Sequence, residues 1–266
     1  MIGAIIGDIV GSVYEFDNIK TKEFELFADH HGQACFFTDD TVMTAAVGYA
    51  LMKADADWST LPELAVKSMR MFGRLHPDCG YGERFGMWLF LDDPVPYNSF
   101  GNGSAMRVGP VAYAARTLEE TQELSYAVSA ITHNHPEGIK GAAAVAECVF
   151  LAKNGAQKKD IREHIASVYY PLEKTIDQIR PGYRFDETAQ ETVPVAIEAF
   201  LESEDFEDAI RTAISVGGDS DTVAAITGSI AEAYYGVPKR LSEKARTYLS
   251  SDLLQVLNRF EEKYKP

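Results

Sequence analysis

The sequence has few basic residues and lacks a long apolar run. Its 25 Lys and Arg are outnumbered by 40 Asp and Glu, which gives a formal net charge of −15. Such a surface repels phosphate backbones and anionic lipid, so we expect neither nucleic-acid backbone binding nor a membrane partner. The apolar N-terminus MIGAIIGDIVGSV contains Asp8, has no basic residue before it and is too short to span a bilayer. We therefore expect a cytoplasmic protein.

Paired cysteines and nucleophile motifs are also missing. The three cysteines, at positions 35, 79 and 148, are widely spaced and form no metal or redox motif, so we expect reduced structural thiols. No Gly-x-Ser-x-Gly elbow occurs, and this argues against a nucleophilic serine. Runs of alternating apolar and polar residues are absent, whereas helical periodicity dominates. The sequence therefore predicts an all-α protein, and no shift in composition divides residues 1–266 into more than a single domain.

The periodicity predicts many helices, with ends uncertain by a few residues. They cover residues 1–15, 41–54, 61–73, 104–116, 118–131, 138–153, 158–168, 190–202, 206–215, 222–235, 242–249 and 251–263. Thr60 with Glu63 and Thr117 with Glu120 fit a capping box, and Gly155 and Gly236 stand where a C-terminal glycine is favoured. Three long irregular stretches, 74–84, 92–103 and 170–187, are rich in Gly, Pro and aromatics, which is typical of binding loops.

Two acidic motifs precede apolar helical runs: TDDT at 38–41 and GGDSDT at 217–222. Inside a helix, adjacent carboxylates would point about 100° apart and could not share a ligand. At a helix start, however, consecutive side chains can converge beyond the helix end. For one such motif the simpler interpretation is N-capping, since Asp and Thr accept the free backbone N–H bonds there.

The repetition of this chemistry favours a cation site. If the two helix starts meet, four carboxylates lie together, and only cations stabilise that arrangement. Carboxylate and hydroxyl ligands without cysteine indicate Mg²⁺, Mn²⁺ or Ca²⁺ rather than Zn²⁺, and four carboxylates suit two ions. Gly217 and Gly218 allow a sharp turn before Asp219.

The N-terminal helix carries glycines at every fourth position, 3, 7 and 11, which predicts one face in close contact with a neighbour. Asp8, Ser12 and Glu15 form an adjacent polar stripe. For Asp8 and Ser12 a solvated face and a functional role are equally compatible with the pattern. Glu15, at the expected helix end, is better placed to reach a metal-bound water.

The stretch NSFGNGSAMRVGP at 98–110 runs into a predicted helix, and such a loop forms an anion site suited to a diphosphate. Arg107 would add positive charge or pair with a structural carboxylate. In the sequence His133-Asn134-His135, we expect one histidine to donate to a phosphate or the backbone and the other to be structural. Tyr81 and Phe100 lie in glycine-containing loops, where an exposed ring stacks on a purine.

Together these motifs resemble the ADP-ribosylglycohydrolase family, which includes the dinitrogenase-reductase-activating glycohydrolase and the ADP-ribosyl-acceptor hydrolases. The resemblance extends from residue 1 to about 236, and the two acidic motifs in their order are its most specific part. The loop at 17–32 matches no subfamily, and the chain is short beside larger members. The motifs that carry the resemblance are Gly3-x3-Gly7-Asp8-x2-Gly11 with Glu15, Thr38-Asp39-Asp40-Thr41, Gly80-Tyr81-Gly82, Gly101-Asn102-Gly103-Ser104-x-Met106-Arg107, Thr132-His133 and Gly217-Gly218-Asp219-Ser220-Asp221-Thr222.

The resemblance implies an orthogonal multi-helix bundle with a binuclear Mg²⁺ or Mn²⁺ centre in a central cleft. It implies these metal ligands: Thr38, Asp39, Asp40, Asp219, Asp221 and Thr222. Glu15 would contact a metal or its water and, with Asp39, Asp40 and Asp219, would be catalytic. The implied ADP-ribose site is lined by Gly80, Tyr81, Gly82, Ser99, Asn102, Gly103, Ser104 and His133, with Phe100 near the adenine.

The activity that the resemblance implies is hydrolysis of the bond at C1″ of ADP-ribose on an arginine, a serine or a small acceptor, so the partner would be an ADP-ribosylated protein or small molecule. A ligand aspartate or Glu15 would take a proton from the attacking water. Two alternatives stay open. One is a non-catalytic ADP-ribose-binding or structural member of the fold. The other is a Mg²⁺-dependent all-α diphosphate enzyme, although such enzymes space their acids one helical turn apart.

Overall fold

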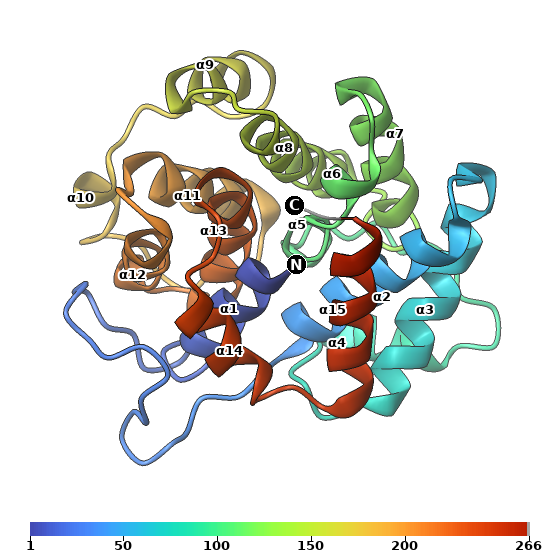
Figure 1. Ribbon diagram of the computed structural model, residues 1–266, viewed down its shortest axis with the longest axis horizontal. Helices are drawn as coiled ribbons and strands as arrows, with labels where there is room; N and C mark the ends of the chain where they lie inside the picture. The colour runs from blue at the N-terminus through green and yellow to red at the C-terminus, as the bar shows by residue number, and fades with distance from the viewer. Residues whose placement is uncertain (265–266) are drawn as a thin grey trace.

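The computed structural model describes residues 1–264, and within that range the regular structure is helical (Figure 1). This confirms the predicted all-α class. The helices are α1 (Ile2–Gly11), α2 (Asp39–Ala54), η1 (Trp58–Thr60), α3 (Leu61–Leu75), α4 (Glu83–Phe90), α5 (Gly103–Met106), α6 (Val111–Ala114), α7 (Leu118–Ser129), α8 (Pro136–Lys153), α9 (Lys158–Val168), α10 (Ile176–Ile179), α11 (Ala189–Glu202), α12 (Phe206–Val216), α13 (Ser220–Tyr235), α14 (Lys239–Arg246) and α15 (Ser251–Lys263).

The helix pair α1 and α13 forms the centre of the bundle. Every residue of α1 is buried, because its ten residues are apolar or small apart from Asp8. The glycine stripe lets the two backbones touch: a Cβ on Gly3 would lie 2.2 Å from the carbonyl oxygen of Gly228, and one on Gly7 would lie 2.1 Å from that of Ala224. The predicted close-packing face is therefore present. Since Gly11 meets Asp221, the helices run antiparallel, and the end of α1 lies at the start of α13.

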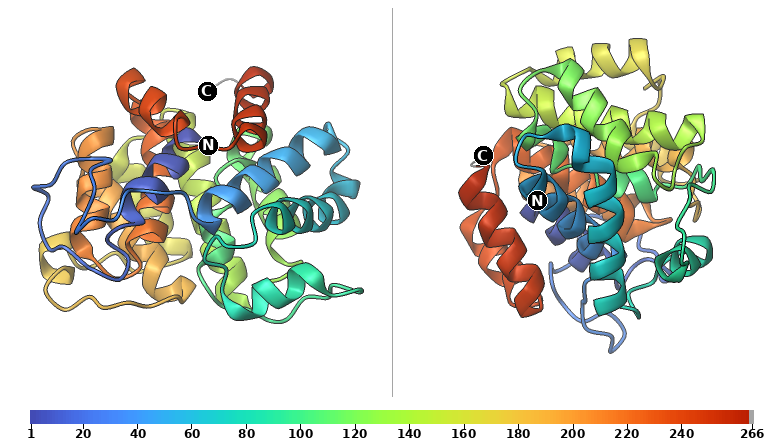
Figure 2. Two further views of the ribbon diagram at one scale, coloured as in Figure 1. Left: turned by 90° about the horizontal axis from the view of Figure 1, so that it is seen from below. Right: turned by 90° about the vertical axis from the view of Figure 1, so that its right-hand side faces the viewer.

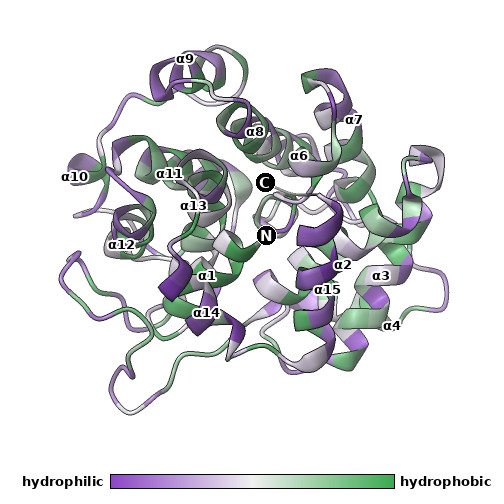
Figure 3. Cartoon of the chain, viewed as in Figure 1, coloured by the Kyte–Doolittle hydropathy of each residue, from purple (hydrophilic) through white to green (hydrophobic). Residues whose placement is uncertain are grey.

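The other long helices surround this pair (Figures 1 and 2). On one side α2 packs against α3 and α15, and on the other α13 packs against α8, α11 and α12. In Figure 3 the outer helix α14 is strongly hydrophilic, whereas α1 in the middle is mainly hydrophobic, as expected when one helix is enclosed and the other faces water. No helix among the described residues is long and apolar enough to cross a membrane.

Some predicted helix ends are wrong. The helix expected over 104–116 is divided into α5 and α6, because Pro110 lacks an N–H and Gly109 lies against Ser229, where a Cβ would be 2.8 Å from its hydroxyl. The helix expected over 1–15 ends at Gly11, where the Ser12 hydroxyl donates to the carbonyl of Ile9 at 2.9 Å and competes with the helical pattern.

Two short helices were not predicted, and the expected capping boxes form only in part. α10 lies in the 170–187 stretch, whose Gly and Pro content indicated a loop. α4 overlaps the 74–84 stretch at residues 83 and 84 and otherwise covers residues for which no element was predicted. Thr117 accepts from the backbone N–H of Glu120 at 3.1 Å without the reciprocal bond, and Thr60 makes no side-chain cap. The C-terminal glycines Gly155 and Gly236 do have positive φ, 81° and 73°.

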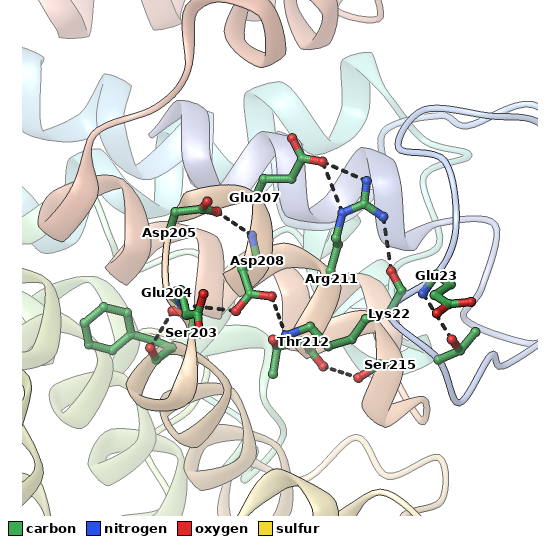
Figure 4. Close-up of polar contacts among 12 residues, drawn as sticks. Lys22, Glu23, Ser203, Glu204, Asp205, Glu207, Asp208, Arg211, Thr212 and Ser215 are labelled. Carbon is green, nitrogen blue, oxygen red and sulfur yellow. Dashed lines mark hydrogen bonds and ion pairs between the residues drawn. The ribbon is translucent and has the colours of Figure 1, made fainter.

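The segment between α1 and α2, residues 12–38, contains no helix and lies along α12. These contacts fix it there: Arg211 donates to the carbonyls of Lys22, at 3.1 Å, and Phe24, and Lys22 pairs with Asp208. Figure 4 shows the contacts of Lys22 with Arg211 and Asp208. These bonds replace the regular structure that the segment lacks, and they hold the chain that connects α1 to the first acidic motif.

Candidate functional site

The first acidic motif forms the start of α2, as its sequence predicts. Thr38 is the N-cap residue, and its hydroxyl accepts from the backbone N–H of Asp40 at 3.4 Å. The buried carboxylate of Asp8 accepts from the backbone N–H groups of Thr38, at 2.9 Å, and Thr41, at 3.1 Å, and from the Thr38 hydroxyl at 2.7 Å. Asp8 therefore caps α2 from the neighbouring helix, and a solvated position for it is wrong.

The second acidic motif forms the start of α13. Gly217 and Gly218 both have a φ of 72°, a conformation that side chains with a Cβ rarely adopt, so the expected sharp turn is confirmed. Asp219 is the N-cap residue, and its carboxylate accepts from the side-chain amide of Asn102 at 2.7 Å. That bond ties the glycine-rich loop to the acidic motif.

The two helix starts meet, as the repeated motif predicts. Carboxylate oxygens of Asp8, Asp40 and Asp221 lie within 4.8 Å of one another, and so do those of Glu15, Asp219 and Asp221. Asp221 belongs to both groups. Two adjacent acidic groups that share one carboxylate have the form of a site for two cations with a bridging ligand. Asp39 lines the same cavity but belongs to neither group.

The negative charges of the cluster repel one another, and a nearby positive charge would stabilise them. Burial, with the nearby charges of Asp221 and Asp8, raises the pKa values of Asp39 and Asp40 well above their usual range. Burial likewise raises the pKa of Glu15 to about 8 and that of Asp219 to about 7, the latter despite the bonds it accepts from Asp221 and Asn102. Carboxylates shift in this way when they are buried among like charges.

One oxygen of Asp40 marks where a cation fits. Its Oδ2 accepts from the hydroxyl of Thr222 at 3.1 Å and lies 3.4 Å from that of Thr38, which donates to Asp8. Its Oδ1 is buried and has no hydrogen-bond partner among residues 1–264. An unpaired buried carboxylate oxygen is costly unless an ion satisfies it. The oxygen-only donor set and this unpartnered atom both fit a hard divalent cation.

The cluster lies on the floor of a cavity of about 580 Å³. Its lining includes all six predicted metal ligands, Glu15, and these predicted ADP-ribose residues: Gly80, Gly82, Ser99, Asn102, Gly103 and His133. Three others are not in the lining. Tyr81 packs against Phe85, Phe100 against His135, and the buried Ser104 hydroxyl donates to the carbonyl of Gly138 at 2.8 Å.

His133 and Arg107 form a buried polar wall of this cavity. Within residues 1–264 Arg107 pairs with no carboxylate; it donates to the hydroxyl of Thr132 at 2.8 Å, and the same hydroxyl lies 2.8 Å from Nδ1 of His133. Burial and the charge of Arg107 hold the pKa of His133 well below its usual range, so the imidazole is neutral. Burial lowers the pKa of Arg107 to about 10, which leaves it charged, and its Nε has no hydrogen-bond partner in the described part of the chain. The cavity therefore has an acidic floor and one cationic wall.

Some cavity residues had no signal in the sequence. Phe16 and Phe185 stack at the rim with ring centroids 5.7 Å apart, although 169 positions separate them, and Glu187 lies beside them. The unusual exposure of Phe16, 84%, is visible only in the fold. Asp8 did have a signal, its position one turn before Ser12 on the polar stripe, but the pattern could not assign it to a site.

Fold and site together define an all-α protein with an acidic cleft of the kind that holds divalent cations. The chain belongs to the ADP-ribosylglycohydrolase family, because the family model of that description matches residues 1–265. It is thus an enzyme of the ADP-ribosyl-acceptor glycohydrolase class.

Individual relatives agree with this assignment. The chain is 27% identical to ADP-ribosylhydrolase ARH3 of Homo sapiens, over 99% of this chain and 93% of the relative. It is 29% identical to ADP-ribosylarginine hydrolase Tri1 of Pseudomonas putida, over 89% and 70%. It is 27% identical to the ADP-ribosyl-[dinitrogen reductase] glycohydrolase of Rhodospirillum rubrum, over 89% and 84%. A solved structure titled ADP-ribosylglycohydrolase-related protein complex shares the fold, with a TM-score of 0.70, 24% identity and coverage of 97% and 96%.

Proposed function

We propose that this cleft hydrolyses the glycosidic bond at C1″ of ADP-ribose attached to a protein side chain, arginine or serine, or to a small acceptor, and releases ADP-ribose. The observation that carries the proposal is the pair of acidic groups that share Asp221 on the cavity floor. The three free cysteines and the acidic composition are consistent with action in the cytoplasm, which we also propose.

The proposed cofactor is a pair of divalent cations, Mg²⁺ or Mn²⁺. The residues that would hold them are Thr38, Asp39, Asp40, Asp219, Asp221 and Thr222, all of which line the cavity. When bound, the ions would supply Lewis acidity and lower the pKa of water. Asp8 would act indirectly, by fixing the start of α2, and Asn102 would fix Asp219.

Glu15 is the residue we propose to accept the proton of the attacking water. It lies with Asp219 and Asp221, yet it is half-buried rather than enclosed, so water in the cavity can reach it. The carboxylates around it would stabilise positive charge that develops at C1″. In this proposal the proton acceptor and the groups that stabilise the charge are neighbouring carboxylates of one acidic cluster.

The opposite wall suits the ADP-ribose diphosphate. A Cβ on Gly103 would lie 3.2 Å from Nε2 of His133, so the loop passes directly over that ring. The N–H of Gly101 donates to the Ser99 hydroxyl at 3.2 Å and that of Asn102 to the carbonyl of Glu187 at 2.7 Å, so the backbone donor that we propose for a phosphate is Gly103, at the start of α5. Arg107 supplies the positive charge at this wall. Tyr81, Phe100 and Ser104 remain predicted ADP-ribose residues in this proposal.

The rim favours a cationic acceptor. Phe16 and Phe185 stack at the mouth, and Glu15 and Glu187 line the cavity beside them. Aromatic faces and carboxylates both attract a guanidinium group. We therefore expect arginine-linked ADP-ribose to be a better substrate than serine-linked ADP-ribose, in line with the name of the Tri1 relative.

A substrate panel tests the proposal. Peptides with ADP-ribose on arginine or on serine, and a small ADP-ribosylated acceptor, are incubated with Mg²⁺, Mn²⁺ or EDTA, and released ADP-ribose is measured. We expect release that needs a divalent cation and is fastest from arginine. Release that persists in EDTA would refute the cation assignment, and no release from any substrate would refute the hydrolase.

A further inference from the structure

A second group of metal-ligating side chains lies in the 12–38 segment, outside the acidic cluster. Nε2 of His30 lies 3.0 Å from Oδ2 of Asp17, and Nδ1 of His31 lies 2.7 Å from the same oxygen. One donor atom from each of the three residues lies within 4.8 Å of the others. Within residues 1–264 the ion-pair partners of Asp17 are these two imidazoles, so neither Lys nor Arg neutralises it.

The local fold aims both rings at the carboxylate. His30 and Gln33 exchange two backbone hydrogen bonds of 2.9 Å across a turn in which His31 and Gly32 both have positive φ, 48° and 85°. This is the pattern of a type I′ turn. The two rings stack with centroids 4.2 Å apart, and the buried Tyr14 packs against His30 at 4.7 Å. The Tyr14 contact therefore fixes the His30 ring, whereas the exposed ring of His31 can rotate.

We propose that Asp17, His30 and His31 form a binding site for a divalent transition-metal ion such as Zn²⁺. Two imidazole nitrogens and one carboxylate oxygen are the donor set of three-ligand zinc sites, in which water takes the fourth position. Tetrahedral ligands at about 2.1 Å from zinc stand roughly 3.4 Å apart. The two nitrogens lie 3.0 and 2.7 Å from the carboxylate oxygen, and all three donors lie within 4.8 Å of one another, so the site needs a rearrangement that rotation of the exposed His31 can supply.

This site differs from the acidic cluster in its donor atoms and in the part of the chain that a bound ion would restrict. The acidic cluster offers oxygen donors alone, which suit Mg²⁺ or Mn²⁺, whereas nitrogen donors favour the later transition metals. Asp17 follows Glu15 and Phe16, which line the cavity. An ion bound to Asp17 and both histidines would therefore tie the cleft wall to the 30–33 turn and restrict a segment that has no helix of its own.

The experiment separates the two sites by saturating the first. Full-length protein is stripped with EDTA, dialysed into excess Mg²⁺ and titrated with Zn²⁺ by calorimetry, and Co²⁺ is added in a parallel sample to record its visible absorption. We expect one Zn²⁺ per chain above the Mg²⁺ background and a Co²⁺ spectrum typical of nitrogen ligation. His31→Ala and Asp17→Asn should each weaken Zn²⁺ binding by at least about tenfold.

Two controls make the result specific. Gln33→Ala alters an exposed side chain of the same turn, and His76→Gln removes a histidine elsewhere, so both should retain the Zn²⁺ affinity of the wild type. Circular dichroism checks that each variant is folded. Equal Zn²⁺ binding by wild type and His31→Ala, or no Zn²⁺ binding by the Mg²⁺-saturated wild type, would overturn the proposal.

Discussion

Asp40 lies at the start of a helix, and one of its carboxylate oxygens lacks a hydrogen bond within residues 1–264. It lies in the first turn of α2, where a negative charge is favourable, and one of its oxygens accepts from the hydroxyl of Thr222. The other oxygen is buried without a hydrogen-bond partner among the described residues, and Asp8 and Asp221 lie beside Asp40. Helix capping alone would leave this oxygen in water. Its burial among like charges is therefore better explained by cation binding than by stability.

Asp40→Asn separates these two roles. Because the substitution removes one of several mutually repelling charges, the variant should be at least as resistant to heat as the wild type in EDTA. Its kcat/KM should fall by about 10²-fold or more, since cation binding needs the carboxylate. Asp78→Asn is the matched control, because Asp78 lines the same cavity outside both acidic groups. Wild-type activity in Asp40→Asn, measured with Mg²⁺ or Mn²⁺, would remove Asp40 from the site.

At the scale of elements, the contact between α1 and α13 determines the geometry of the floor. The glycines of α1 let its backbone lie directly on α13, and the antiparallel course brings Asp8 and Glu15 to the start of α13. α2 adds its carboxylates because Asp8 caps it. The acidic cluster is thus assembled from two helix starts and one helix end, and it depends on spacing that a single methyl group would change.

Gly7→Ala tests this dependence. The new Cβ would lie 2.1 Å from the carbonyl oxygen of Ala224, so α1 must move, and we expect a loss of about 1–3 kcal/mol in the free energy of unfolding together with reduced activity. Gly86→Ala in α4 is the control, because its Cβ would meet nothing closer than Tyr81 at 3.9 Å, and it should be neutral or gain about 0.5–1 kcal/mol. Equal urea unfolding curves for the two variants would contradict the close packing.

In the whole molecule, the fold brings carboxylates from the N-terminal segment, α2 and α13 together in one acidic cluster. The sequence is strongly acidic, and the floor concentrates that charge where Coulombic repulsion is least screened. Ligands that bind only the folded state stabilise it by mass action. Divalent cations should therefore act on the stability of the entire bundle as well as on its chemistry.

Thermal unfolding measures this effect. At a cation concentration of about 100 times Kd the gain is roughly 2.7 kcal/mol, which for a domain of this size raises Tm by roughly 5–10 °C. Mg²⁺ or Mn²⁺ should produce the rise, EDTA should reverse it, and Asp221→Asn should abolish most of it because Asp221 belongs to both groups. A Tm that stays constant across cation concentrations in the wild type would argue against a cation at the floor.

Local sequence pattern predicts the helical class, the two helix starts with their carboxylates, and the glycine face of α1, because each of these depends on spacing along the chain. Local pattern could not show that Asp8 caps α2, that Arg107 pairs with Thr132 rather than a carboxylate, or that α1 ends before Glu15. It also could not place Phe16 against Phe185, or Asp17 against His30 and His31. Those contacts join residues far apart in the chain or on an irregular segment, where no periodicity records the partner, so only the packing of the helices decided them.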